Sequence, residues 1–386
     1  MNRRIFLWGG LGLVGLSAGG LAAWLAGLPP APDPKTPPPI APEETAATLA
    51  ALKPPQKLPQ KQSGRARPLI AVIGINDGTE TTDYLMTYGI LARADIADVT
   101  ALATGPGPVT LYPALQVMPQ ASLRDFDARH PDGADYVIVP AMRRDDDPQV
   151  LQWLKEQAGK GAIIVGVCVG ALVVANAGLL DGRKATTHWY TLGKLRDRHP
   201  AIRYAANRRL VVDRGVATTT GITASMPMML TLIEAIAGRG KAEDVARGLG
   251  LAHWDARHDS EAFRLTRPFA LTVMKNNLAF WLHERLGLEI APGVDEVALA
   301  LVADAWSRTY RSQVVTFAAV AGPVRSRSGL RILPDRAAAG WDPATRLPPL
   351  GAKPAQALED ALAGIRKRYG SATADIVAMQ LEYPRP

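Results

Sequence analysis

The sequence predicts an α/β fold built on a largely parallel sheet. Short apolar runs rich in β-branched residues indicate buried strands, and they alternate along the chain with longer helix-like segments. Such alternation is typical of parallel sheets flanked by helices. The strand-like runs are RPLIAVIGI, DVTALAT, ADYVIVPA and AIIVGV, and the helix-like segments are GTETTDYLMTYGILARA and PQVLQWLKEQAGKG.

The composition is that of a globular protein with room for two domains. Of the 386 residues, 47% are hydrophobic and 21% are charged, and the formal net charge is +8. The basic residues are spread among acidic ones, so we expect a solvated surface and no nucleic-acid partner. A single cysteine excludes an intramolecular disulfide, and no Cys/His spacing resembles a zinc site. We therefore expect neither a metal nor a cofactor.

Residues 1–28 have the pattern of a membrane anchor or export signal. Arg3 and Arg4 precede an uncharged stretch from Ile5 to Leu28, and about 20 apolar residues are enough to span a bilayer. Basic residues on this flank favour a cytoplasmic N-terminus. We therefore expect a single-pass transmembrane helix in the inner membrane, with the folded part on the periplasmic side. A cleaved signal is the alternative, because RRIFL resembles the twin-arginine signal, but no clear cleavage site follows the apolar run.

Four further segments are expected after this one. Residues 29–67 are rich in proline and lysine and predict a semi-extended spacer. Residues 68–253 contain the strand and helix alternation and form the first folded domain. Residues 254–290 include RPFALTVMKNNLAFWLHERLGL, which predicts a connecting amphipathic helix, and residues 291–386 form a second unit.

The second unit resembles a truncated copy of the first. In GPGPVTLYPALQVMPQA, Pro108 and Pro119 fall opposite Pro323 and Pro334 of AGPVRSRSGLRILPDR at one constant offset. The same offset places Glu80 opposite Asp295. Internal similarity of this kind indicates duplication. The second copy has no cysteine and ends before an elbow strand could form. We therefore expect it to pack against the first domain instead of repeating its chemistry.

The only cysteine of the chain lies between a predicted strand and a predicted helix. AIIVGV leads into Cys168 and GALVVANAGLL follows, which is the setting of a nucleophile elbow. Gly166 and Gly170 flank the cysteine where a side chain would collide with neighbouring backbone. A helix N-terminus favours a thiolate, so we expect Cys168 to be partly exposed, with a thiol pKa below its ordinary value, and the Val169 N–H to donate to an oxyanion. The alternative is a buried, inert cysteine after a core strand.

These residues resemble the DJ-1/PfpI family of the class I glutamine amidotransferase-like superfamily. The motif CVGALVVANAGLLDGRKATTHW is similar to the family's elbow, helix and following strand, and the closest branches are the isocyanide-hydratase-like proteins and the sensor domains of AraC-type regulators. The resemblance covers about Pro68 to Leu251 and implies a flavodoxin-like parallel sheet flanked by helices. Further matches are GTETTDYL, VIVPAM and VVDRGVATTTGITASMPMMLTLIEAIAG.

The resemblance also implies roles for individual residues. Cys168 matches the family's reactive thiol, Glu80 matches the acidic residue that contacts it, and His188 matches the histidine near the cysteine. A protonated Glu80 would donate a hydrogen bond to the thiolate and relay a proton. His188 would act as a base or orienting group, or else be a satisfied polar residue at a strand end. The expected oxyanion and pocket residues are Val169, Gly170, Ala141, Met142, Thr219, Thr220 and Gly221.

Two departures from the family pattern affect the expected chemistry. The loop that commonly supplies oxyanion N–H groups as Pro-Gly-Gly is Pro140, Ala141 and Met142 here, and Pro227 replaces an acidic residue that relatives often carry in the last helix. A bulkier loop keeps its backbone donors but narrows the site. With these changes we still expect the fold, but the sequence does not assign a particular hydrolytic reaction.

Three functions remain open. The first is a membrane-tethered cysteine hydrolase or hydratase acting on a small electrophilic substrate. The second is a non-catalytic module that binds a ligand or senses oxidation through Cys168. The third is a relative of transcription regulators, against which the missing DNA-binding motifs weigh. The expected partners are a small molecule and, through the N-terminal helix, the membrane. A homodimer with a second copy of the chain is also possible. The alternative to it is an internal pseudo-dimer, in which the second unit covers a surface that relatives use for dimerisation.

Overall fold

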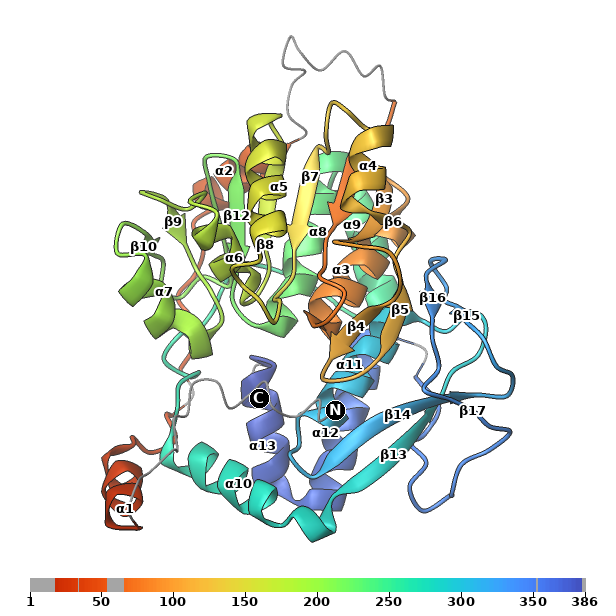
Figure 1. The fold of residues 1–386 in the computed structure, drawn as a ribbon. Helices are drawn as coiled ribbons and strands as arrows, with labels where there is room; N and C mark the ends of the chain where they lie inside the picture. Colours follow the sequence, from red (N-terminus) through yellow and green to blue (C-terminus); the bar gives the residue numbers. More distant parts are fainter. Residues whose placement is uncertain (1–17, 34, 54–65, 352, 384–386) are drawn as a thin grey trace.

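The computed structural model describes residues 18–33, 35–53, 66–351 and 353–383, and its centre is a seven-stranded sheet (Figure 1). The strand order is β11-β12-β8-β7-β1-β3-β6, and neighbouring strands are parallel except for the antiparallel pair β11 and β12. The expected α/β fold with a largely parallel sheet is therefore confirmed. The strands are β1 (Leu69–Val72), β3 (Asp98–Ala103), β6 (Ala121–Ser122), β7 (Tyr136–Val139), β8 (Ile163–Gly166), β11 (Leu210–Asp213) and β12 (Val216–Thr219).

Helices cover both faces of this sheet, which explains why its central strands are continuously apolar. In β1, Ile70 and Val72 pack into one core, whereas Leu69 and Ala71 pack into the other. Strands that are buried on both faces have no polar side to alternate with. The first core includes α3 (Thr81–Ala94), α8 (Ser225–Ala237) and α9 (Arg239–Leu249), and the second includes α4 (Leu123–Arg129), α5 (Pro148–Gly159) and α6 (Gly170–Asn176).

The C-terminal half forms a smaller parallel sheet with its own helices. Its strand order is β13-β14-β17, and both neighbouring pairs are parallel. The elements are α10 (Arg267–Leu278), η4 (Phe280–Leu282), β13 (Glu284–Glu289), α11 (Glu296–Ser307), β14 (Ser312–Ala318), β17 (Arg336–Ala337), α12 (Pro354–Tyr369) and α13 (Ser371–Gln380).

A five-stranded sheet joins the two halves. Its order is β15-β16-β5-β4-β2, and β16 pairs with β5 in antiparallel register, with Ile332 opposite Val117. Because each half contributes strands to this sheet, backbone hydrogen bonds cross from one half to the other. The strands are β2 (Thr79–Glu80), β4 (Val109–Tyr112), β5 (Gln116–Met118), β15 (Val324–Arg325) and β16 (Arg331–Ile332).

Helices α3 and α11 also pack directly against each other, and two ion pairs cross their contact. Arg93 of α3 binds Asp295 at the start of α11, and Arg308 at the end of α11 binds Glu80 at the start of α3. The two arginines are separated in sequence by the same interval as Glu80 and Asp295. The two ion pairs are therefore reciprocal, as in the self-complementary interface of a symmetric dimer.

The expected transmembrane helix, and with it the single-pass inner-membrane location, is wrong. No helix in the part of the chain that the structure describes is long and apolar enough to cross a bilayer. Helix α1 (Ala18–Gly27) has 10 residues, which is about 15 Å, whereas a hydrocarbon core is about 30 Å thick. The arginine pair and the first part of the apolar run, in residues 1–17, lie outside the described residues.

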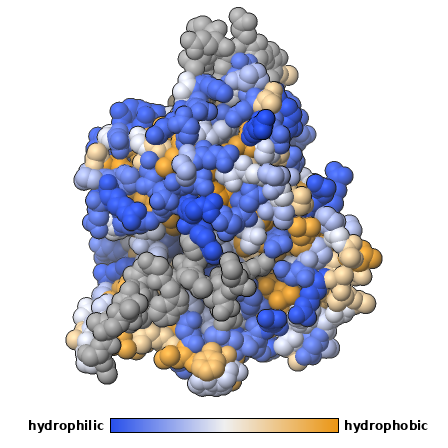
Figure 2. Space-filling view, viewed as in Figure 1, coloured by the Kyte–Doolittle hydropathy of each residue, from blue (hydrophilic) through white to orange (hydrophobic). Residues whose placement is uncertain are grey.

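Helix α1 lies beside α10, and Arg267 of α10 binds the C-terminal end of α1. The Arg267 guanidinium donates hydrogen bonds to the backbone carbonyls of Leu25, Ala26 and Leu28. These contacts satisfy carbonyl groups that a helix C-terminus leaves without intrahelical partners. In Figure 2, hydrophobic residues gather on the surface at the end of the molecule where α10 lies. The exposed hydrophobic side chains of this region are Leu271, Leu278, Phe280, Trp281 and Leu282.

A helix also forms inside the proline-rich segment that was expected to be a spacer. Helix α2 (Pro42–Leu52) begins at a proline, and its last residue, Leu52, is fully buried. The Tyr136 hydroxyl donates to the Leu52 carbonyl, and Glu44 forms an ion pair with Arg208. Residues 42–52 are thus packed on the main sheet's domain. Residues 54–65 lie outside the described residues.

The contact between α3 and α11 leaves no space for a side chain at Gly89. A Cβ there would lie 2.5 Å from Glu296 Oε1 and 2.8 Å from Val297 Cγ2. We expect Gly89→Ala to lower the free energy of unfolding by about 1–3 kcal/mol, measured by chemical denaturation. The control is Gly193→Ala in α7 (Leu192–Arg198), where nothing lies within 4 Å and alanine stabilises a helix by up to about 1 kcal/mol. Equal behaviour of the two variants would contradict the close packing of α3 on α11.

Candidate functional site

Cys168 lies on a sharp turn between β8 and α6. Its backbone has φ of 57°, which is unusual for a residue with a side chain. The Cys168 N–H donates to Thr219 Oγ1 at 3.0 Å, which fixes the turn against β12. Gly170 allows the close approach of α6, because a Cβ there would lie 1.9 Å from the Val139 carbonyl oxygen. The local geometry is that of a nucleophile elbow.

The thiol itself is buried, contrary to the expected partial exposure. Only 3% of Cys168 is accessible. Burial raises the pKa of the Cys168 thiol well above its ordinary value, and the nearby carboxyl groups of Asp83, Glu80 and Glu382 raise it further. A backbone hydrogen bond from Val169 acts in the opposite direction. The expected lowering of the thiol pKa is therefore wrong, because desolvation and negative charge outweigh the helix N-terminus.

Asp83 has the largest electrostatic effect on the thiol, and the sequence analysis missed it. It is fully buried, its Oδ2 accepts a hydrogen bond from the Ala141 N–H at 3.0 Å, and its Oδ1 has no hydrogen-bond partner among the described residues. Burial, and then the charge of Glu80, raise the pKa of Asp83 well above its ordinary value. The signal in TETTD was the spacing of three residues, which places both acids on one face of a helix.

Glu80 caps the N-terminus of α3 and is paired with an arginine. Its Oε2 accepts hydrogen bonds from the Asp83 N–H at 2.6 Å and from the Thr82 hydroxyl at 2.7 Å. Its Oε1 accepts from Arg308 Nη2 at 2.7 Å. Both carboxylate oxygens are thus occupied by donors other than the thiol. The relay role that the resemblance implies for Glu80 therefore stays a prediction, and Asp83 is the acid with an oxygen to spare.

His188 faces the C-terminal segment of the chain. Its Nε2 lies 3.0 Å from the Gln380 carbonyl oxygen, and its Nδ1 accepts from the Tyr190 N–H. Burial lowers the pKa of His188 below its ordinary value. These contacts fit a neutral imidazole that is protonated on Nε2. His188 therefore orients the segment after α13 in this structure.

That segment closes over the expected pocket. The Trp189 N–H donates to Glu382 Oε1 at 2.9 Å, and the Thr223 hydroxyl donates to the Glu382 carbonyl at 2.7 Å. Glu382 Oε2 has no hydrogen-bond partner among the described residues, although His258 Nε2 lies 3.6 Å away. A Cβ at Gly221 would collide with the Glu382 side chain. The tail thus places a further buried carboxyl group beside the thiol.

The other predicted pocket residues line the same buried region. Thr219 Oγ1 donates to the Thr220 carbonyl, and Thr220 Oγ1 is buried without a partner among the described residues. The Ala141 N–H is already used by Asp83, and the Gly170 N–H donates to the Val167 carbonyl. Met142 is buried and forms an isolated bridge with Thr79. Of the expected oxyanion donors, Val169 is the one whose N–H points to the sulfur.

The site has features that suit acid and base chemistry. Among the residues that the structure describes, no group of three or more His, Cys, Asp or Glu could hold a metal ion. Arg308 lies among acidic groups, where its Nε donates to Asp304 at 2.8 Å. Burial raises the pKa of Asp304 to about 7. Arg308 and Glu382 were also missed, because they come from the far half of the sequence and no local motif marks them.

Comparison with known proteins gives matches to the N-terminal half of the folded chain. Residues 70–235 match the model of the DJ-1/PfpI family. An isonitrile hydratase of Pseudomonas putida is 32% identical over 171 residues, which is 42% of this chain and 69% of the relative. The HTH-type transcriptional regulator CdhR of Pseudomonas aeruginosa is 30% identical over 128 residues, which is 33% of this chain and 38% of the regulator.

Among solved structures, the crystal structure of Drosophila melanogaster DJ-1beta matches with a TM-score of 0.44 and 24% identity. This match covers 48% of this chain and 100% of the fly protein.

The environment of the thiol makes its titration a direct test of the site. We expect the alkylation rate of native Cys168 to rise only above the ordinary thiol pKa of about 8.5, and Asp83→Asn to move this rise to lower pH by removing the strongest acidic neighbour. The measurement is the rate of reaction with iodoacetamide against pH, and the denatured chain gives the reference. Since the chain has one cysteine, the profile reports this thiol alone.

The control is Asp125→Asn. Asp125 is an exposed residue of the capping box of α4, and it is not among the groups that shift the thiol pKa. A native profile with its midpoint below 8.5, or no shift in Asp83→Asn, would contradict the site as described.

Proposed function

The chain belongs to the DJ-1/PfpI family, and from this membership we propose that it is a cysteine-dependent hydratase or hydrolase for a small, uncharged electrophile of the isocyanide or carbonyl type. The nucleophile is Cys168 and the proton donor and acceptor is Asp83. The relative named isonitrile hydratase supports the reaction class, since this chain covers 69% of it at 32% identity.

One observation carries the proposal. The Cys168 thiol lies buried on its strained elbow, and of the neighbouring groups Asp83 affects its pKa most. Asp83 is itself a buried acid, and its Oδ1 has no hydrogen-bond partner among the described residues. Burial raises the pKa of each group, so the charged form of each is disfavoured in the site. A buried site of this kind favours an uncharged substrate, because a charged substrate would lose its solvation on entering.

The hydration of an isocyanide shows how these groups would act. The Cys168 sulfur forms a bond to the terminal carbon, and the thiol proton passes through Asp83 to that carbon, giving a thioimidate. Water then adds to the same carbon. One of its hydrogens goes to nitrogen, and the other returns through Asp83 to sulfur as the carbon–sulfur bond breaks. The products are an N-substituted formamide and the free thiol, and no oxidant or reductant is consumed.

A ligand-binding module without turnover is the second candidate. The observation that favours it is the closure of the site, because Cys168 is 3% accessible and Glu382 of the C-terminal segment lies over it. The similarity to part of a transcription regulator is consistent with a binding role. Redox sensing is less favoured, since the thiolate is the form that oxidants attack and the raised thiol pKa disfavours it.

The C-terminal half fits the role of an internal partner. The reciprocal pairs of Arg93 with Asp295 and of Arg308 with Glu80, and the antiparallel pairing of β16 with β5, follow the pattern of a two-fold interface. This arrangement supports a duplicated, truncated copy that forms a pseudo-dimer with the first domain. The α3 face is then already covered, so a homodimer through this face is not expected.

The proposed reaction predicts a clear loss of turnover in two variants. With the full chain and a small alkyl or aryl isocyanide, we expect formamide production that Cys168→Ser abolishes and Asp83→Asn lowers by about 10²- to 10⁴-fold, since a positioned proton donor contributes about that much. Product is followed by chromatography. The control is the exposed Asp181→Asn, which is expected to keep the wild-type rate.

Turnover that survives in Cys168→Ser would contradict the proposed nucleophile. Saturable binding without turnover, seen as stabilisation of the wild-type chain against heat, would favour the binding module instead.

A further inference from the structure

The buried site contains more acidic groups than basic ones. Asp83, Glu80 and Glu382 raise the pKa of the Cys168 thiol, and Asp304 is fully buried next to Glu80. The groups that face the thiol region come from both halves of the chain: Glu80 at the end of β2, Asp83 of α3, Tyr112 of β4, Asp304 of α11, Arg308 directly after α11, His188 before η2 (Trp189–Thr191), and Glu382 of the C-terminal segment.

Arg308 is the cation of this cluster, and its side chain is 9% exposed. Nη2 donates to Glu80 Oε1 at 2.7 Å, and Nε donates to both oxygens of Asp304 at 2.8 and 2.9 Å. Two carboxyl groups therefore hold the guanidinium from different helices. Its planar fork is suited to bridging them, as a lysine ammonium is not.

We propose that Arg308, which the C-terminal half supplies, is a positioning residue for Cys168 that favours its thiolate and fixes Glu80 at the start of α3. The positive charge of Arg308 acts on the thiol, and its hydrogen bond to Glu80 fixes the start of α3. The candidate site of the N-terminal domain is thus incomplete without the second half of the chain.

The sign of the effect follows from the neighbours. The charge of Glu80 raises the pKa of the Cys168 thiol, and the Arg308 guanidinium, 2.7 Å from Glu80 Oε1, offsets that charge. The charges of Asp304 and Glu80 raise the pKa of Arg308 against the effect of burial, and the charge of an ionised Cys168 raises it further. That attraction is mutual, so the cation lowers the free energy of the thiolate. Without the Arg308 side chain, the remaining carboxyl groups would make the thiolate harder to form.

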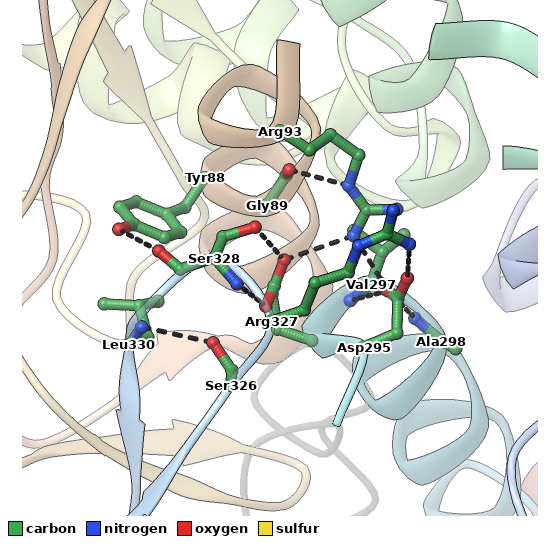
Figure 3. A network of polar contacts seen from close by, with 11 residues as sticks. Tyr88, Gly89, Arg93, Asp295, Val297, Ala298, Ser326, Arg327, Ser328 and Leu330 are labelled. Atoms are coloured by element: carbon green, nitrogen blue, oxygen red, sulfur yellow. Dashed lines mark hydrogen bonds and ion pairs between the residues drawn. The ribbon is translucent and has the colours of Figure 1, made fainter. Parts of the chain in front are cut away.

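The chain also contains a matched control. Arg93 is the counterpart of Arg308 at the other end of the contact between α3 and α11, and its side chain is 8% exposed. It binds Asp295 at 2.8 Å and Glu296 at 3.1 Å. Figure 3 shows this network, in which Arg93 points towards Asp295, with Tyr88 and Ser328 nearby. Arg93 therefore stabilises the same interface, while Cys168 is not part of its network.

The experiment compares Arg308→Gln with Arg93→Gln in the full chain, using the reaction of Cys168 with iodoacetamide as a function of pH. We expect Arg308→Gln to move the midpoint of the profile to higher pH. A midpoint that rises by about one on the pH scale makes the reaction about tenfold slower at a fixed pH below it, because only the thiolate reacts. We expect Arg93→Gln to leave the profile in place. Arg308→Lys keeps the positive charge but loses the planar guanidinium, so we expect a smaller shift of the midpoint than in Arg308→Gln.

Two results would overturn the proposal: an unchanged pH profile of the alkylation rate in Arg308→Gln, or the same shift of the profile in both glutamine variants. Either result would mean that Arg308 has only a structural role. If Arg308→Gln fails to fold, as judged by circular dichroism, Arg308→Lys and Arg93→Lys decide in the same way. A higher midpoint in the Arg308 variant alone supports the proposal. The thiol titration needs no turnover, so an inactive protein would count only against the proposed hydration.

Discussion

Helices α3 and α11 bury charged side chains against each other, with Arg308 bound to Glu80 at one end of the contact and Arg93 bound to Asp295 at the other. The first of these ion pairs lies at the start of α3, from which Asp83 reaches the elbow of Cys168. The position of the acid beside the thiol therefore depends on a helix that the second half of the chain holds in place.

The cost of burying these charges explains why the contact has its particular form. A buried ion pair contributes little net stability, but a buried charge that loses its partner is strongly destabilising. Arg308 is bound by two carboxyl groups and Glu80 accepts three hydrogen bonds, so most of the lost hydration is replaced. Among the described residues, Arg93 Nη1 in this contact and the carboxylate oxygens Asp83 Oδ1 and Glu382 Oε2 are buried without a hydrogen-bond partner. Asp83 and Glu382 both raise the thiol pKa, and buried carboxylate oxygens left without a partner beside a thiol are typical of functional sites.

Much of the fold could be predicted because it rests on local patterns. The apolar runs at Leu69–Val72, Tyr136–Val139 and Ile163–Gly166 are strands, and the strand, cysteine and glycine order at Cys168 is an elbow. The acid with the larger effect on the thiol could not be chosen from the motif, because Glu80 and Asp83 are one helical turn apart and only packing decides between them. The thiol exposure was wrong for a similar reason. The C-terminal segment contributes Glu382 to the buried site, and no local signal marks its position after α13.

The two halves of the chain are joined at the site by the ion pair of Glu80 and Arg308, and a double-mutant cycle between these residues tests their coupling. The free energy of unfolding is measured for the wild type, Glu80→Gln, Arg308→Gln and the double variant. We expect a coupling energy of about 1–3 kcal/mol, because each single variant leaves a buried charge without this partner and the double variant does not. Additive single effects would contradict it, since they would mean that the two groups do not depend on each other.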